Sequence, residues 1–161
     1  MAMRTLVHFF VSYARDDQSC ANDLFFRLQQ QMTRSRAYEH KLWRDTAILV
    51  GERWNDEIIQ AIEACEVGLL FVSPAFLGSP FIERQEVPRL IGHAEKLIVP
   101  VMLRPVSFDR HDLKGLSDHQ IYRLDRQKSY SECNGDRVRS RFVEALFLEI
   151  EHRLDRVLSS K

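Results

Sequence analysis

The sequence predicts an α/β fold in which a five-stranded parallel sheet, of order 2-1-3-4-5, carries helices on both faces. Strand-like and helix-like segments alternate along the 161 residues, which is typical of a parallel sheet with helical crossovers. Residues 67–72 and 97–103 are continuous apolar runs, as expected for parallel strands buried on both faces. Right-handed crossovers then place the first strand in the centre of the sheet.

The first strand is predicted at residues 6–11, where β-branched and aromatic side chains dominate. Asp16 and Asp17 suit the start of the helix that follows, and this helix should end near Ser35. Its apolar side chains form one stripe at helical spacing: Ala21, Leu24, Phe25 and Leu28. Residues 41–44 form a short second strand.

The second half of the chain continues the alternation. An amphipathic helix is marked by Trp54, Ile58, Ala61, Ile62 and Cys65. Residues 67–72 are the third strand, and a helical region extends to Ala94. Residues 97–103 are the fourth strand, in which Pro100 favours a place near the sheet edge or a strand end. After an irregular connection, a short fifth strand is expected at residues 120–124 and a closing helix at 137–159, so residues 1–161 form a single domain.

Composition limits the function classes. Lys plus Arg and Asp plus Glu both number 23, so no general attraction to nucleic acid or anionic membranes is expected. The three cysteines (Cys20, Cys65 and Cys133) form no CxxC or CxxH pair, which argues against a zinc site or a disulfide framework. Reduced thiols, the lack of a signal-peptide pattern and the short apolar runs together predict a cytoplasmic domain without metal or cofactor.

Three nucleotide-related or signalling classes of α/β protein fit poorly. Residues 11–17, which follow the first strand, contain no glycine, although phosphate-binding NTPases and dinucleotide-binding Rossmann domains need glycines there. A response-regulator receiver would carry a phospho-accepting aspartate at the end of the third strand. This chain has Ser73 at that place.

Four sequence blocks instead carry a family resemblance. They read FVSYARDD at 10–17, WRD at 43–45, GERW at 51–54 and SPAFLGSPFIERQEVP at 73–88. In this order they resemble a Toll/interleukin-1 receptor (TIR) domain, and the bacterial branch in particular. The resemblance covers roughly residues 5–125, and it implies a flavodoxin-like three-layer sandwich.

The resemblance implies an activity. Many bacterial TIR domains are NAD⁺ glycohydrolases, which cleave the nicotinamide–ribose bond and release nicotinamide with ADP-ribose or a cyclic relative. Other members are non-catalytic modules that bind further TIR domains in signalling. We expect a hydrolase with NAD⁺ as its substrate, serving bacterial antiphage immunity and activated by oligomerisation. The alternative is a TIR–TIR scaffold.

The family pattern assigns the catalytic role to Glu86. Departure of nicotinamide builds oxocarbenium-like charge on the ribose, and one carboxylate near the sugar stabilises that charge. Neutral nicotinamide leaves without a proton, so a second carboxylate is dispensable. From spacing alone, the favoured interpretation of Glu86 is a solvated helix residue paired with Arg84 or Arg89, and the family pattern reverses that preference. The nearby Glu83 is not selected by the pattern and suits a surface ion pair.

The resemblance also implies substrate contacts near the carboxyl edge of the sheet. The predicted set is Ser12, Tyr13, Arg15, Asp45, Phe81 and Ile82. Family enzymes often carry a tryptophan one turn before the glutamate; here Ile82 stands there, and Phe81 offers the aromatic face. From the residues alone, Ser12 suits a turn, Arg15 a solvated charge and Asp45 a loop cap.

An apolar run, Ile48-Leu49-Val50 before Gly51, lies in the loop of residues 46–52. Exposed apolar runs of this kind need a partner surface. In TIR domains the equivalent loop mediates self-assembly, so we expect contact with another copy. The alternative is that these side chains fold back on the domain.

Overall fold

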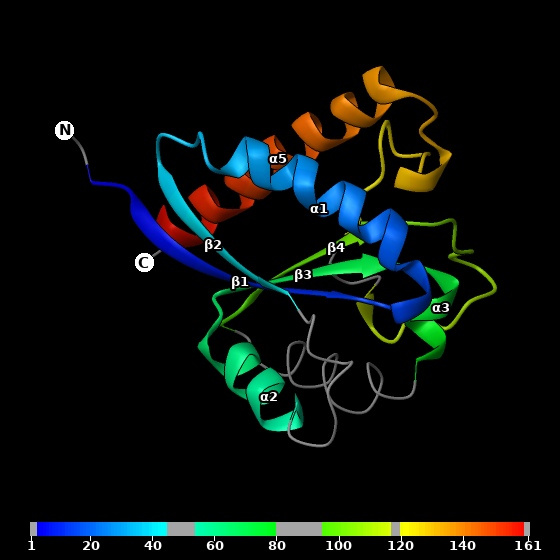
Figure 1. The fold of residues 1–161 in the computed structure, drawn as a ribbon, viewed down its shortest axis with the longest axis horizontal. Coiled ribbons are helices and arrows are strands. Elements are labelled where there is room, and N and C mark those ends of the chain that lie inside the picture. Colours follow the sequence, from blue (N-terminus) through cyan, green and yellow to red (C-terminus); the bar gives the residue numbers. More distant parts are fainter. Residues whose placement is uncertain (1–2, 45–53, 80–94, 117–119, 160–161) are drawn as a thin grey trace.

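The computed structural model describes residues 3–44, 54–79, 95–116 and 120–159 (Figure 1). Within these ranges four parallel strands form one sheet of order β2-β1-β3-β4. The strands are β1 (Thr5–Tyr13), β2 (Tyr38–Arg44), β3 (Val67–Val72) and β4 (Leu97–Met102). The predicted parallel sheet with a central first strand is therefore confirmed.

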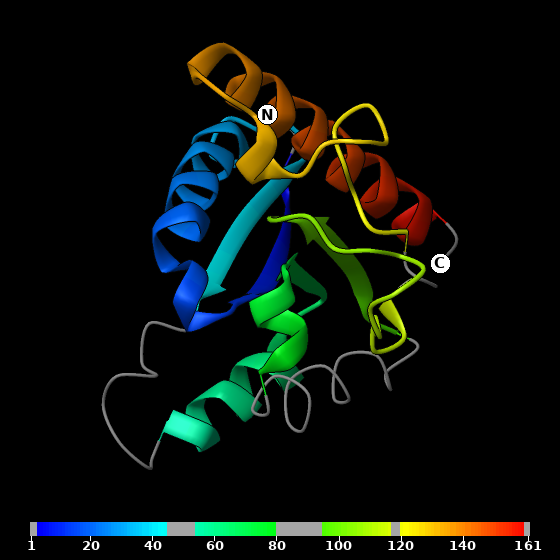
Figure 2. The same ribbon diagram turned by 90° about the vertical axis from the view of Figure 1, so that its right-hand side faces the viewer.

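Helices cover both faces of the sheet, as Figures 1 and 2 show. The α-helices are α1 (Gln18–Met32), α2 (Trp54–Ala64), α3 (Pro74–Gly78) and α5 (Asp136–Ser159). Two short 3-10 helices, η1 (Arg15–Asp17) and η5 (Tyr130–Glu132), precede α1 and α5. None of the described helices is long and apolar enough to span a membrane.

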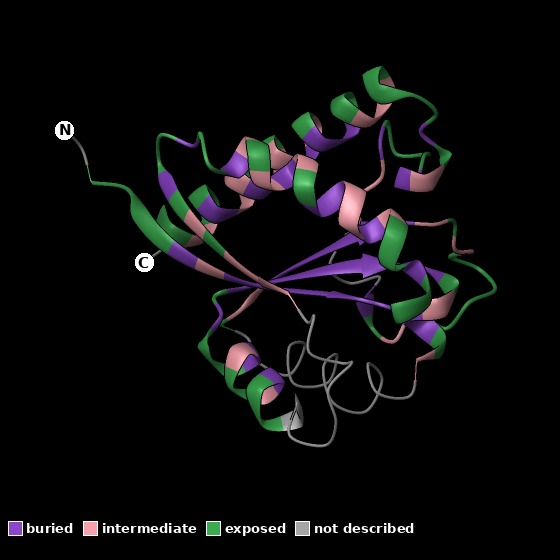
Figure 3. Ribbon diagram, in the orientation of Figure 1, coloured by how far each residue is buried: buried purple, intermediate pink, exposed green. Residues whose placement is uncertain are grey.

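Two apolar cores lie on opposite faces of the sheet (Figure 3). The larger core packs α1 and α5 on one face, with Phe9 of β1, Phe71 of β3 and Phe142 of α5 all at 1% exposure or less. The smaller core packs α2 and α3 on the other face around Phe10 and Phe76. Every residue of β3 is buried, which agrees with its continuous apolar sequence.

The second strand begins three residues earlier than predicted. Tyr38, Glu39 and His40 extend β2, and their register runs from Thr5↔Tyr38 onward along β1. These three residues alternate in polarity and form no apolar run, so the sequence pattern did not predict them as strand. Mixed polarity is tolerated here because β2 lies at the edge of the described sheet and pairs with β1 alone. His40 nevertheless has a fully buried side chain, whose Nε2 lies 2.8 Å from Glu151 of α5.

The prediction of a fifth strand at residues 120–124 is wrong: the described residues form four strands. A single bridge joins this segment to β4, where Tyr122 N–H donates to Pro100 (2.8 Å) and Met102 N–H donates to Tyr122 (2.9 Å). The next ladder bond would need an N–H on Pro100, which proline lacks. Gln120, at φ 56°, also lies in the left-handed region, which a strand does not accommodate.

Candidate functional site

The structure describes part of the predicted site. Three predicted substrate contacts, Ser12, Tyr13 and Arg15, fall in described ranges. The other predicted residues lie outside the described residues: Asp45, Ile48, Leu49, Val50, Gly51, Phe81, Ile82, Glu83 and Glu86. Their roles stay predictions.

Ser12 and Tyr13 belong to the first strand itself, which runs two residues further than predicted. Tyr13 pairs in register with Phe71, and the two rings stack with their centroids 6.3 Å apart on the α1/α5 side. Ser12 pairs with Leu70 of the α2/α3 core and is buried on that opposite face. Arg15 follows in η1 and is exposed. The side chains of Ser12 and Tyr13 thus lie on opposite faces of the sheet, as the alternation of side chains along a strand requires.

A polar cluster, two of whose three members are buried, joins the carboxyl ends of three strands. Asp17, at 3% exposure, follows β1 through η1, and its carboxylate accepts a hydrogen bond from the hydroxyl of Ser73, which follows β3. The second carboxylate oxygen lies 2.7 Å from Nε of Arg104, which follows β4. We call Asp17, Ser73 and Arg104 the edge cluster. It holds these three turns together where open parallel sheets carry their sites.

Ser73 has a second role within the edge cluster. It is the N-cap of α3, and its Oγ accepts the backbone N–H of Phe76 at 3.0 Å. Pro74 occupies the first turn of α3, where a missing N–H costs nothing and the fixed φ suits a helix. The hydroxyl of Ser73 therefore donates to Asp17 while it caps α3, so the start of α3 is tied to the end of β1.

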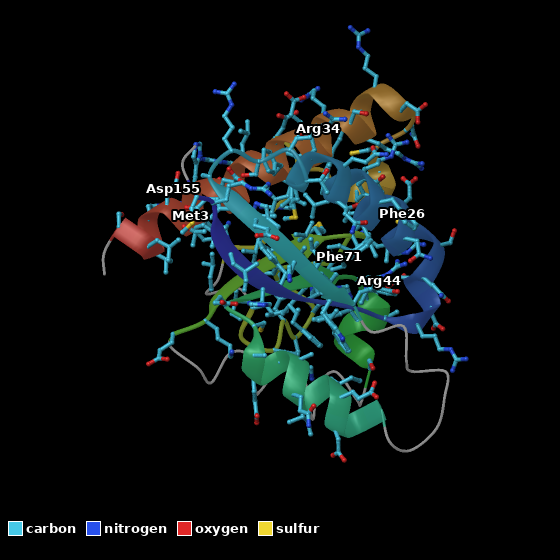
Figure 4. All side chains as sticks on the ribbon, turned by 60° about the vertical axis from the view of Figure 1, so that its left-hand side comes forward. Met3, Phe26, Arg34, Arg44, Phe71 and Asp155 are labelled. Atoms are coloured by element: carbon cyan, nitrogen blue, oxygen red, sulfur yellow. The ribbon has the colours of Figure 1, made fainter. Side chains whose placement is uncertain are left out.

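The carboxyl end of β2 is fixed by a different set of contacts. Arg44 donates from Nη1 to Asn22 of α1 at 2.5 Å. Its guanidinium also lies over the rings of Phe25 (4.4 Å) and Phe26 (5.3 Å), a cation–π arrangement. Figure 4 shows Arg44 and Phe26 at this end of the molecule. These contacts fix the last residue of β2 against α1.

The edge cluster was not foreseen from the sequence. Asp17 was predicted to begin a helix, and it does occupy the N-cap of α1, but its side chain makes no cap hydrogen bond. Its partners are 56 and 87 residues away, so no local pattern reveals the pairing. The one available signal is that all three residues follow predicted strands, whose carboxyl ends meet at one edge. Among the described residues no group of three or more His, Cys, Asp or Glu could hold a metal ion.

An open parallel sheet with a central first strand, helices on both faces and a polar cluster at its carboxyl edge defines the flavodoxin-like class of α/β domain. The sequence model of the TIR domain family matches residues 9–138, well over half of the chain. The chain therefore belongs to the TIR domain family. A search of curated proteins found no match.

Proposed function

We propose that this TIR domain is an NAD⁺ glycohydrolase of the bacterial type, with Glu86 as its catalytic residue. The observation that carries the proposal is the position of Glu86 in the family pattern, within the segment that directly follows α3. Family membership supports it, because NAD⁺ cleavage is an activity of many TIR domains.

The reaction breaks the bond between nicotinamide and the ribose carbon. The bonding electrons leave with nicotinamide, which departs neutral, and positive charge develops on the sugar. The carboxylate of Glu86 stabilises that charge until water, or a nucleophile within the ADP-ribose itself, attacks the same carbon. Ser12, Arg15, Asp45, Phe81 and Ile82 are the proposed substrate contacts. Tyr13 is included among them at its backbone, because its ring packs on Phe71.

Self-association is the proposed route of activation. Domains of this family typically associate with one another, and the run Ile48-Leu49-Val50 beside Gly51 is the proposed contact loop. Cytoplasmic NAD⁺ depletion triggered by assembly would suit a role in antiphage defence. Partners are then NAD⁺ and further copies of the domain, with no nucleic acid or membrane.

The test is direct. Concentrated protein is incubated with NAD⁺, and nicotinamide, ADP-ribose and cyclic products are separated by chromatography. Glu86→Gln should keep the fold and lose about a hundredfold or more in rate, whereas the control Glu83→Gln should lose far less. An active Glu86→Gln variant, or equal losses in both variants, would show that the wrong carboxylate was assigned. Absence of cleavage at all concentrations, with association preserved, would favour the scaffold alternative.

A further inference from the structure

A cavity of about 580 Å³ lies between α1, Arg104 just beyond β4, η5 and the start of α5. Six of its lining residues carry the argument: Cys20, Asp23, Phe26, Arg104, Tyr130 and Arg139. Its volume falls within the range of sites for small organic ligands. It opens beside the α1/α5 core, whereas Ser12 and α3 lie on the other face of the sheet. Among the proposed substrate contacts that the structure describes (Ser12, Tyr13 and Arg15), none lines this cavity.

Two guanidinium groups converge on this cavity. Arg104 enters from the end of β4, and Arg139 enters from the first turn of α5. Burial raises the pKa of the Cys20 thiol, while Arg104 and Arg139 both act to lower this pKa. Both arginines line the cavity together with Cys20.

Each guanidinium keeps donors for a ligand. Arg104 makes one side-chain hydrogen bond within the described part of the chain, from Nε to Asp17. Arg139 donates from Nε to the carbonyl of Cys133 (3.1 Å) and lies 3.5 Å from Asp23 through Nη1. An arginine has five N–H donors in a planar fork, which matches phosphate and carboxylate oxygens.

The acidic lining residue is already paired with donors of the protein. Asp23 already accepts the hydroxyl of Tyr130, and Nε of Arg27 lies 3.3 Å from it. Burial and the Asp23 carboxylate raise the pKa of Tyr130, so its hydroxyl remains a donor at neutral pH. Asp23 is matched by these donors and by Arg139, and Asp17 is matched by Arg104, so the cavity offers an anion the remaining N–H donors of two arginines rather than a net positive charge.

An apolar surface stands beside the charged residues. Phe26 is 54% exposed and lines the cavity; the guanidinium of Arg44 lies over its ring at 5.3 Å, so the exposed remainder of the ring is what a planar group can contact. We propose that this cavity binds a small organic phosphate of mononucleotide size, with the phosphate between Arg104 and Arg139 and the planar ring against Phe26. Charge-assisted bidentate bonds supply the specificity for phosphate.

Cys20 gives a local readout that is independent of NAD⁺ cleavage. It is the one partly exposed cysteine of the chain, since Cys65 and Cys133 are buried. The rate of Cys20 alkylation by a maleimide is measured in the 161-residue chain against rising AMP, with adenosine as the matched probe that lacks the phosphate. AMP should slow alkylation saturably, and adenosine at the same concentrations should not.

Variants then locate the phosphate contact. Arg139→Gln should weaken protection by AMP about tenfold or more, and the control Arg137→Gln, an exposed neighbour on α5, should behave as wild type. Arg139→Lys keeps the charge but not the planar fork. It should weaken protection by a smaller factor, and it supplies the measurement if Arg139→Gln fails to fold.

Three results would overturn the proposal. The first is an unchanged Cys20 rate up to about 10 mM AMP, a concentration at which even millimolar binding is visible. The second is equal protection by adenosine and AMP, which would remove the role of the phosphate. The third is wild-type affinity for AMP in folded Arg139→Gln, or in Arg139→Lys where the first variant does not fold.

Discussion

Removing Arg104 from the edge cluster should destabilise the domain well beyond the loss of an ordinary surface ion pair. The side chain of Asp17 is only 4% exposed, and Nε of Arg104 lies 2.7 Å from its carboxylate. Arg104→Gln leaves that charge buried with Ser73 as its remaining hydrogen-bond donor within the cluster. A buried charge without its ionic partner is costly, because neither water nor a counter-charge compensates for lost hydration.

The structure sets the size of the effect. Loss of one partner from a fully buried pair costs about 3–5 kcal/mol. Here 43% of the Arg104 side chain is exposed, so water reaches the position once the guanidinium is gone. The hydroxyl of Ser73 also keeps its bond to Asp17. We therefore expect a loss of about 2 kcal/mol in the free energy of unfolding, which lowers Tm by about 4–8 °C in a domain of this size.

A second arginine–carboxylate pair provides the matched control. Nη2 of Arg141 lies 2.5 Å from Asp125, but the side chains are 59% and 64% exposed. Arg141→Gln should cost about 0.5 kcal/mol or less. Urea unfolding followed by circular dichroism gives both values. Equal losses in Arg104→Gln and Arg141→Gln would refute the reasoning, as would a double variant Asp17→Asn/Arg104→Gln that recovers none of the loss.

Two further predictions concern assembly and pH. The rate of NAD⁺ cleavage per molecule should rise with protein concentration. Ile48→Asp should abolish that rise without lowering Tm, because it places an unpaired charge in the interface. A constant rate per molecule in wild type, or an unfolded variant, would contradict this. Burial lowers the pKa of His40 below its ordinary value of 6.5. As the pH falls, the imidazole is therefore protonated in the unfolded chain before it is protonated in the folded one. The free energy of unfolding should then decrease as the pH drops from about 7 through 6.5 and below. The decrease is measured as the change of the urea midpoint with pH. It should be smaller in His40→Gln than in wild type and unchanged in the control His8→Gln, which alters an exposed pair. An unchanged pH dependence in His40→Gln would contradict the assignment to His40.

The sequence predicted most accurately the strands that are buried along nearly their whole length, β3 and β4. Residues 67–72 were predicted from an unbroken apolar run and form β3 with the same bounds. Residues 97–103 differ from β4 (Leu97–Met102) by one residue. The β2 prediction was shorter than the observed strand because Tyr38 and His40 have side chains buried through polar contacts, with the exposed Glu39 between them. The hydroxyl of Tyr38 donates to Asp155, and Nε2 of His40 lies 2.8 Å from Glu151.

The site was predicted less completely than the sheet. The family pattern points to Glu86 because it is a run of neighbouring residues, and such runs are visible in one sequence. The edge cluster depends on three turns separated by whole crossovers, so its pairing becomes visible only when the strands are placed side by side. The general rule that sites gather at carboxyl ends points to the edge of the sheet where the edge cluster lies, but it does not give the partners of Asp17.

Pro100 has a consequence for how copies of this domain can join. Edge strands with unpaired N–H groups invite pairing between molecules, which is a common route to aggregation. On β4 the proline removes one of those donors, and Tyr122 occupies the positions on either side of Val101. Continuous sheet extension across this edge is therefore blocked. Self-association of the kind that TIR domains typically show would then have to use side-chain surfaces, loops or the β2 edge, so Pro100 restricts which surfaces are open to it.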